Sequence, residues 1–216
     1  FVKRVGKIIS SKGKKMIGWD EILEGGLADG ATVMSWRGMK GGIAAAKMEH
    51  EVVMSPTTFA YLDYSQGDHT VENQIYADLS LEKSYTFEPV PEGVDPKYIL
   101  GGQGNLWSEV VPNLPYAFYM TYPRAFALSE TLWSPKEKKN WDSFIDRTEH
   151  HFKRFDATKT NISKAVYDPI VHVYIENDTL MCELKNSILN SEIYTTIDNT
   201  YPVQFGFKYE GSFEIP

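Results

Sequence analysis

Aromatic and polar side chains recur at four places in the first half of the sequence, each time directly after a short apolar run. The four segments are Trp19-Asp20-Glu21, Ser35-Trp36-Arg37-Gly38, Tyr61-Leu62-Asp63-Tyr64 and Trp107-Ser108-Glu109. Aromatic faces pack against the apolar C–H faces of sugar rings, and carboxylates accept hydrogen bonds from sugar hydroxyls. The recurrence of both residue types therefore indicates a carbohydrate site.

Each of these residues also has a purely structural interpretation. A single tryptophan at the end of a strand is more often part of a hydrophobic core than a platform for a ligand. Asp20 and Glu21 suit the first turn of a helix, where carboxylates are favoured, and Asp63 and Glu109 suit solvated loops. The coincidence at four consecutive segments favours one shared site.

Short buried strands are expected immediately before the four segments. The apolar runs cover residues 15–19, 31–36, 51–55 and 98–102, and a strong helix-forming stretch at 42–48 lies between two of them. Alternating strands and helices predict a parallel α/β architecture, and near-continuous apolar strands predict that both faces are covered. Because the carboxyl ends of parallel barrel strands share one rim, the four segments should meet there.

Three further stretches complete this part of the chain. Residues 57–97 form a long polar and aromatic connection without regular structure, which is usually functional. Residues 116–133 have a helical pattern in which Pro123 either introduces a kink or begins a new helix. Residues 141–155 form an amphipathic helix with Asn140 as its N-cap.

The sequence changes character after Asp156. Residues 170–175, 179–184 and 192–197 are strand-like and separated by turn residues, which predicts antiparallel β structure. Three parts of the chain follow from this change. They are an α/β part at 1–156, a linker at 157–168 and a partial β-sandwich-like domain at 169–216.

Composition excludes several classes of protein. The chain has 216 residues, a net charge of -7 and a pI near 5.3, so it lacks the broad basic surface of nucleic-acid-binding proteins. The sequence contains no run of about 18 apolar residues, so it predicts no membrane-spanning segment. With a single cysteine, Cys182, it has no internal disulfide, and we predict no metal site and no cofactor. The start at Phe1, without an initiator methionine or signal peptide, leads us to expect a piece of a longer protein.

The ordered set of motifs resembles glycoside hydrolase family 20, the β-N-acetylhexosaminidases. The motifs are Gly18-Trp19-Asp20-Glu21-Ile22, Ser35-Trp36-Arg37-Gly38, Tyr61-Leu62-Asp63-Tyr64, Gly102-Gln103-Gly104-Asn105-Leu106-Trp107-Ser108-Glu109 and Tyr122-Pro123-Arg124-Ala125-Phe126-Ala127-Leu128-Ser129-Glu130-Thr131-Leu132-Trp133. They span residues 1–155 in the family's order. By this resemblance the chain is the C-terminal half of a (β/α)8 TIM barrel, followed by part of a small antiparallel β domain.

The resemblance implies retaining, substrate-assisted hydrolysis of terminal β-linked N-acetylglucosamine or N-acetylgalactosamine. In the family, the 2-acetamido oxygen of the sugar attacks its own anomeric carbon and forms an oxazolinium ion. A neighbouring Asp-Glu pair of the enzyme orients the acetamide and protonates the leaving oxygen. The expected ligands are therefore oligosaccharides or glycoconjugates that contain N-acetylhexosamine.

Roles for six residues are carried over by the resemblance. Tyr61 is expected to hydrogen-bond the acetamide oxygen, within walls formed by the indoles of Trp19, Trp36 and Trp107. Asp63 is expected to fix Tyr61 or the sugar, and Glu109 to hold sugar hydroxyls. Two other tryptophans, Trp133 and Trp141, are expected to be packing residues.

The sequence also departs from the family pattern. The His-x-Gly-Gly-Asp-Glu motif that carries the catalytic pair does not occur in the 216 residues, and neither does the arginine that grips the sugar hydroxyls. Asp20-Glu21 is a different Asp-Glu pair. Residues 64–106 contain no tryptophan, although the family often has one there. We therefore expect the 216 residues alone to be inactive and to need the N-terminal half of the same protein as a partner.

Two alternatives stay open on the residues alone. The first is a non-catalytic carbohydrate-binding protein that kept the aromatic pocket. The second is a sugar hydrolase of another barrel family that uses Asp20, Glu21 or Glu109 as its acid. For the family itself, the resemblance implies a location outside the cytoplasm, as a periplasmic, secreted or surface-anchored protein.

Overall fold

The fold consists of two compact units. The computed structural model describes residues 1–67, 72, 76–189 and 191–215. The first unit covers residues 1–163 and the second covers residues 164–216. This division falls inside the predicted linker at 157–168. The exact first and last residues of that linker stay predictions.

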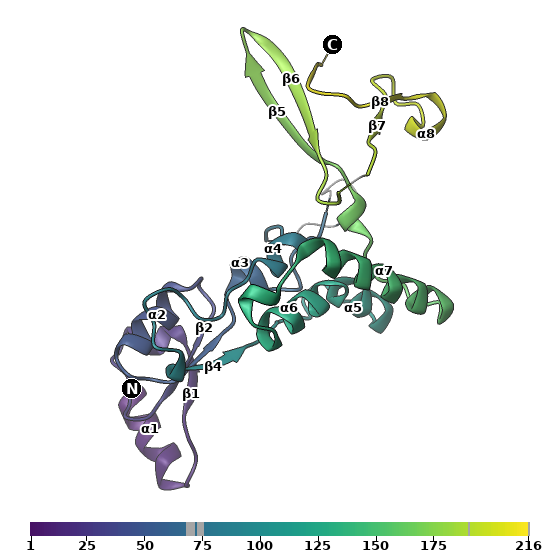
Figure 1. The fold of residues 1–216 in the computed structure, drawn as a ribbon. Coiled ribbons are helices and arrows are strands. Elements are labelled where there is room, and N and C mark those ends of the chain that lie inside the picture. The colour runs from purple at the N-terminus through teal and green to yellow at the C-terminus, as the bar shows by residue number, and fades with distance from the viewer. Residues whose placement is uncertain (68–71, 73–75, 190, 216) are drawn as a thin grey trace. The chain divides into compact units, whose positions relative to one another are not determined.

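A four-stranded parallel sheet organises the first unit. Its strands pair in the order in which they occur in the chain, so each strand lies beside the one before it. Figure 1 shows these strands with helices packed beside them. The strands are β1 (Ile17–Trp19), β2 (Thr32–Ser35), β3 (Val52–Met54) and β4 (Ile99–Gly102). All four predicted strands and their parallel arrangement are confirmed.

The core of this unit lies between the sheet and its covering helices. Val33, Val52 and Met54 are fully buried, and Phe87 and Leu128 pack into the same cluster. Burying one such side chain contributes roughly 1.5–3 kcal/mol, so this cluster fixes where the sheet lies against the helices. The central strands β2 and β3 are largely buried, as their continuous apolar sequences predict, whereas Ile17 on β1 and Leu100 on β4 are more than half exposed, so for these two strands the prediction is wrong.

Helices fill the connections between the strands. Those that precede β4 are α1 (Val2–Ser11), α2 (Lys40–Lys47), α3 (Thr57–Ala60) and α4 (Leu81–Tyr85), and short 3-10 turns cover Asp20–Leu23 and Pro96–Tyr98. The prediction of an irregular connection over 57–97 is therefore wrong at α3 and α4. The Ser80 hydroxyl caps α4 by accepting a hydrogen bond from the amide of Lys83 at 3.1 Å, a local signal that favours a helix start.

The helical pattern after β4 resolves into separate helices. Pro123 begins a new helix rather than kinking one, because α5 (Leu114–Thr121) ends before it and α6 (Arg124–Trp133) follows it. The predicted amphipathic helix is confirmed as α7 (Trp141–Ala157), and a 3-10 turn at Lys136–Lys138 precedes it. The Asn140 side chain caps α7 by accepting from the amide of Ser143 at 2.9 Å.

The two tryptophans expected to pack behave differently. Trp141 packs against Tyr85 and Phe144, with ring centroids 5.4 and 5.7 Å apart, so this prediction is confirmed. Trp133 is 89% exposed, so its prediction is wrong. It is the last residue of α6, and an aromatic side chain at a helix end has fewer neighbouring turns to bury it.

The second unit is antiparallel β structure, as predicted. The hairpin of β5 (Ile170–Glu176) and β6 (Thr179–Lys185) turns at Asn177 and Asp178, whose positive φ values of 49° and 60° suit a tight turn. The remaining elements are a 3-10 turn (Ala165–Tyr167), β7 (Tyr194–Thr195), α8 (Pro202–Phe205), β8 (Phe207–Lys208) and β9 (Phe213–Glu214), with β9 paired to β6 and β7 paired to β8. Within the described ranges, no helix is long and apolar enough to cross a membrane.

A close approach at Gly102 joins the sheet to its covering helix. A Cβ atom at Gly102 would lie 2.7 Å from Cδ2 of Leu132 on α6 and 2.9 Å from the backbone oxygen of Met54 on β3. The same Met54 oxygen accepts a hydrogen bond from the amide of Gln103 at 2.9 Å. A side chain at this position must therefore push apart a helix and a strand that meet at the end of β4.

We predict that Gly102→Ala lowers the free energy of unfolding of the first unit by about 1–3 kcal/mol, because the added methyl group overpacks this contact. Urea unfolding followed by tryptophan fluorescence measures the change. Gly25→Ala is the matched control, because its Cβ atom would meet only Cγ2 of Val2 at an ordinary 3.5 Å. Equal stability of both variants would contradict the prediction.

Candidate active site

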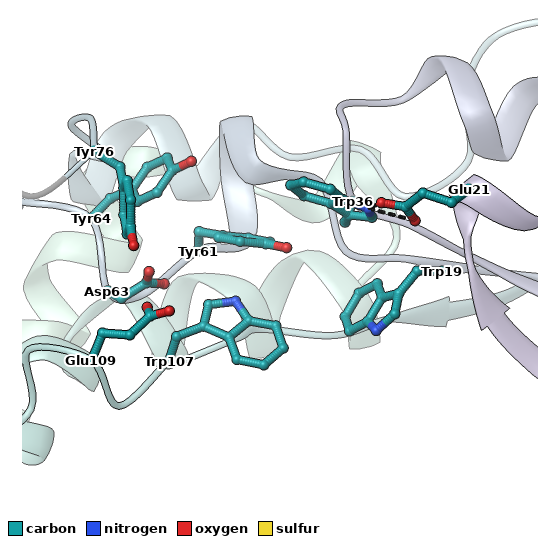
Figure 2. A pocket seen from close by; sticks show the side chains of 9 residues that line it. All are labelled: Trp19, Glu21, Trp36, Tyr61, Asp63, Tyr64, Tyr76, Trp107 and Glu109. Carbon is teal, nitrogen blue, oxygen red and sulfur yellow. Dashed lines mark hydrogen bonds between the residues drawn. The ribbon is translucent and has the colours of Figure 1, made fainter.

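One open pocket of about 440 Å³ collects the residues that the sequence singles out. All six predicted site residues line it, and three further residues complete the wall. Figure 2 shows the full set around the pocket. The lining residues are Trp19, Glu21, Trp36, Tyr61, Asp63, Tyr64, Tyr76, Trp107 and Glu109.

The pocket lies at the carboxyl ends of the parallel strands. Trp19 is the last residue of β1, and Trp36 follows the last residue of β2. The segments that follow β3 and β4 also pair with each other. Tyr61 forms a parallel bridge with Asn105, and the Leu62 amide donates to the backbone oxygen of Asn105 at 2.6 Å. This pairing brings the Tyr61 segment beside the segment that carries Trp107.

Four aromatic rings form the centre of the pocket. Trp36 and Tyr61 are stacked with centroids 6.3 Å apart and an interplanar angle of 23°. Trp107 lies 6.4 Å from Tyr61 and 5.9 Å from Trp19. In Figure 2 the Tyr61 hydroxyl points toward Trp19 and Trp36. The rings therefore line an apolar space with a phenolic donor inside it.

Tyr61 is held as a neutral donor. Its side chain is buried, and burial raises the pKa of the Tyr61 phenol above its usual value. The phenol therefore keeps its proton throughout the neutral range. A protonated phenol in an apolar environment donates a strong hydrogen bond to an oxygen that gains negative charge.

Two carboxylates hold Trp36 in place. Glu21 accepts from Nε1 of Trp36 with both oxygens, at 3.0 and 3.1 Å. Asp20 accepts from the amides of Trp36 and Arg37 at 3.1 and 3.2 Å and forms an ion pair with Nε of Arg37 at 2.6 Å. Arg37 also forms an ion pair with Glu24, and the carboxylates of Glu24 and Asp20 raise the pKa of the Arg37 guanidinium.

These contacts bear on the alternative in which Asp20 is the acid. Asp20 is 1% exposed, and its oxygens are occupied by Arg37 and by backbone amides. A carboxylate so placed orients the β2 loop and has no exposed oxygen to protonate a substrate. Glu21 lines the pocket, but its hydrogen bonds to Trp36 give it a role in fixing the indole.

The opposite end of the pocket is acidic. Figure 2 shows the carboxylates of Asp63 and Glu109 next to each other, beside Tyr64 and Tyr76. Asp63 is 2% exposed, and its Oδ1 has no hydrogen-bond partner within the part of the chain that the structure describes. Burial raises the pKa of the Asp63 carboxyl, and the charge of Glu109 raises it further.

A hydrogen-bonded network supports the loop after β4. The Asn105 amide group donates to the Ser55 hydroxyl at 2.6 Å and accepts from Gln103 at 2.6 Å, while Ser55 donates to the Gln103 oxygen at 2.9 Å. The side chains of Ser55 and Asn105 are buried, so breaking the network leaves their polar groups unpaired. The loop that presents Trp107 and Glu109 is therefore anchored to the end of β3.

Sequence reasoning missed three lining residues. Tyr64 lies within a recognised motif but received no role, and Glu21 was considered as a carboxylate in the first turn of a helix or as the acid of another barrel family. Tyr76 lies 6.3 Å from the ring of Tyr64, and nothing near it in the sequence marks it as part of a site. Its position depends on a bridge between Ser65 and Asp78 that closes the loop. Across the described residues, no cluster of three or more His, Cys, Asp or Glu side chains is placed to bind a metal ion.

Parallel strands whose carboxyl ends carry an indole-lined pocket with carboxylates are the arrangement expected for a sugar site in a protein of the α/β barrel class. Comparison with known proteins narrows this class. Residues 1–136 match the family model described as glycosyl hydrolase family 20, catalytic domain. The chain therefore belongs to glycoside hydrolase family 20.

Similar proteins carry names from the same family. A beta-hexosaminidase of Porphyromonas gingivalis is 45% identical over 166 residues, which cover 74% of this chain and 21% of that protein. A beta-N-acetylhexosaminidase of Cellulomonas fimi is 31% identical over 163 residues, which cover 72% of this chain and 33% of that protein. The chain thus spans between a fifth and a third of the length of these curated relatives.

Solved structures agree on the fold. A family 20 exo-β-N-acetylglucosaminidase of Vibrio harveyi, solved with N-acetylglucosamine, matches 76% of this chain and 27% of its own, with a TM-score of 0.68 and 30% identity. A Streptomyces plicatus beta-hexosaminidase mutant matches 76% and 35%, with a TM-score of 0.70 and 24% identity. The predicted fold class, part of a TIM barrel followed by antiparallel β structure, is confirmed.

The buried carboxylate of Asp63 makes stability depend on pH. Because the pKa of Asp63 is raised in the folded state, its ionised form opposes folding at neutral pH. We predict that Asp63→Asn raises the free energy of unfolding at pH 7. This gain shrinks as the pH falls through the raised pKa, because the wild-type carboxyl then becomes protonated and neutral.

Urea unfolding of both proteins at several pH values between about 4 and 7 measures this difference. Asp146→Asn is the control, since it removes an exposed carboxylate from α7 at the same change in charge. A lower stability of Asp63→Asn at pH 7 would contradict the prediction. It would mean that neighbouring backbone amides and Arg124 stabilise the ionised carboxylate by more than burial costs.

Proposed function

We propose that these residues form part of the catalytic domain of a β-N-acetylhexosaminidase. The enzyme removes terminal β-linked N-acetylglucosamine or N-acetylgalactosamine with retention of configuration, and the sugar's own acetamide acts as the nucleophile. One observation carries the proposal. In a chain of this family, six residues from the ends of four strands converge on one aromatic pocket with a buried tyrosine hydroxyl and an acidic end.

Tyr61 is the residue closest to the proposed chemistry. Its hydroxyl donates to the acetamide oxygen and aligns that oxygen with the anomeric carbon as the oxazolinium ring forms. The stacked Trp36 and the nearby Trp107 keep water from this reactive cation. The phenol carries the proton that this role needs, since its ordinary pKa lies well above neutral pH and burial raises it further.

The acidic end suits the hydroxyl groups of the same sugar. Asp63 and Glu109 line the pocket as hydrogen-bond acceptors. A sugar hydroxyl that donates to the carboxylate of Asp63 would offset part of the cost of burying its charge. Glu109 lies next to it and accepts from a second hydroxyl. Trp19, Trp36 and Trp107 then contact the acetamide and the apolar side of the ring.

The general acid is proposed to come from an N-terminal part of the same protein. Family resemblance places the catalytic Asp-Glu pair one strand before the Gly18-Trp19 segment. In the present sheet β1 and β4 are the edge strands, and Ile17 and Leu100 on them are 52% and 56% exposed. Further parallel strands added at these edges would close the barrel and cover the exposed side chains.

The proposal is tested with a chromogenic N-acetyl-β-glucosaminide, assayed with two proteins. One is the 216-residue chain, and the other is the chain produced together with the coding sequence upstream of Phe1. We predict hydrolysis with retention by the longer protein and none by the 216 residues. In the longer protein, Tyr61→Phe should lower kcat by about 10²-fold, as expected when one donor to the developing charge is lost.

Tyr98→Phe is the matched control, because it removes the same hydroxyl from a tyrosine outside the pocket lining. Hydrolysis by the 216-residue chain at a rate that Tyr61→Phe lowers would overturn the proposed need for a partner. A longer protein that binds N-acetylglucosamine without hydrolysing any hexosaminide would overturn the enzyme assignment. That result would favour the non-catalytic carbohydrate-binding protein instead.

A further inference from the structure

Arg124 is a fully buried cation at the start of α6. It is 0% exposed, and burial lowers the pKa of its guanidinium to about 9, which still leaves it charged at neutral pH. Removing a charge from water is costly, so a buried arginine is weak support for stability by itself. The contacts of Arg124 must therefore offset the cost of its burial.

All four hydrogen bonds of its two terminal nitrogens go to backbone oxygens. Nη2 donates to the oxygen of Leu62 at 2.7 Å and to that of Met120 at 2.7 Å. Nη1 donates to the oxygen of Tyr64 at 2.8 Å and to that of Leu79 at 3.0 Å. One planar group thus joins three separate segments of the chain.

Two of these acceptors bracket Asp63. Leu62 and Tyr64 are the residues on either side of Asp63. Arg124 therefore donates hydrogen bonds to backbone oxygens on both sides of this residue and fixes the turn that presents its carboxylate. From the other side, the Leu62 amide donates to the oxygen of Asn105 at 2.6 Å. The turn that carries Tyr61 and Asp63 is therefore held between Arg124 and the segment that follows β4.

The other two acceptors fix where this turn lies. Leu79 ends the loop that carries Tyr76, and its amide donates to the oxygen of Ser65 at 2.8 Å. Met120 lies in the last turn of α5. Arg124 therefore ties the pocket turn to the closing point of a loop and to a packed helix at the same time.

The charge of Arg124 also reaches the pocket. Nearby Glu72 and Asp63 favour the charged guanidinium, and Arg124 in turn lowers the pKa of Asp63 against the effect of burial. Lysine has a charge but lacks the planar fork that reaches four acceptors in fixed directions. The geometry at this position is specific for arginine.

We infer that Arg124 is a positioning residue of the sugar pocket, which sets the Tyr61 hydroxyl and the Asp63 carboxylate at the distances needed for N-acetylhexosamine. It touches no substrate and acts through the turn at residues 61–64. This inference rests on the proposed function, since it assumes that the pocket binds such a sugar. Small displacements of positioned groups weaken recognition strongly, so the effect should appear in affinity.

The test is a titration of the 216-residue chain with N-acetylglucosamine, followed by the NMR signals of the five tryptophan indoles. Three indoles line the pocket, and those of Trp133 and Trp141 do not, which provides an internal control. The proteins compared are the wild type, Arg124→Met, Arg124→Lys and Ile145→Ala. Ile145 is buried on α7 outside the pocket. Its truncation therefore lowers stability, as the Arg124 substitutions are expected to do, but leaves the turn at residues 61–64 unchanged.

We expect the wild type and Ile145→Ala to bind with the same Kd, and Arg124→Met to bind at least about tenfold more weakly. The Kd of Arg124→Lys should be intermediate, because lysine keeps the charge and loses the planar guanidinium. If Arg124→Met does not fold, the Kd of Arg124→Lys decides the question. A wild-type Kd in both Arg124 variants, with only a lower melting temperature, would overturn the inference alone. Absence of binding by the wild type would overturn the assumption that the pocket of these residues binds the sugar, and the inference with it, whereas the proposed function is decided by the assay of the longer protein.

Discussion

Every feature of the pocket depends on the parallel, in-order pairing of four short strands. The polar and aromatic residues lie at the ends of the strands or in the connections that follow them, so pairing in sequence order brings them to one edge. The pairing continues past the strands through Tyr61 and Asn105, which keeps the last two segments aligned at the pocket itself. A slip of one residue in this register would turn Tyr61 or Trp107 away from the site.

The chemistry of the site follows from how differently its two ends are solvated. Around Tyr61 the walls are indole rings, and the phenol is kept neutral by burial. Around Asp63 the wall is anionic, and one buried oxygen lacks a donor. A ligand with an acetamide at one end and hydroxyls at the other satisfies both environments, whereas a purely apolar ligand leaves the acidic end unpaired.

The sequence predicted those parts of the fold that local patterns determine. Apolar runs marked the four strands, and Asn140 and Pro123 marked helix starts, because caps and proline act over a few residues. The six site residues were found because each lies at the end of a strand or in the connection that follows it. Tyr76 was missed because a loop closed at Ser65 and Asp78 brings it to the pocket, and such a contact leaves no local pattern. Trp133 was misjudged because residue type alone does not say which neighbours cover a helix end.

The spacing of the strands along the chain has a consequence for how the pocket assembles. The connection between β1 and β2 covers residues 20–31, whereas the connection between β3 and β4 covers residues 55–98. Closing a longer loop costs more conformational entropy before any contact compensates it. The Trp19 and Trp36 side of the pocket is thus built from local contacts. The Tyr61 and Trp107 side forms only once β3 and β4, the neighbouring strands joined by the longest connection, have paired.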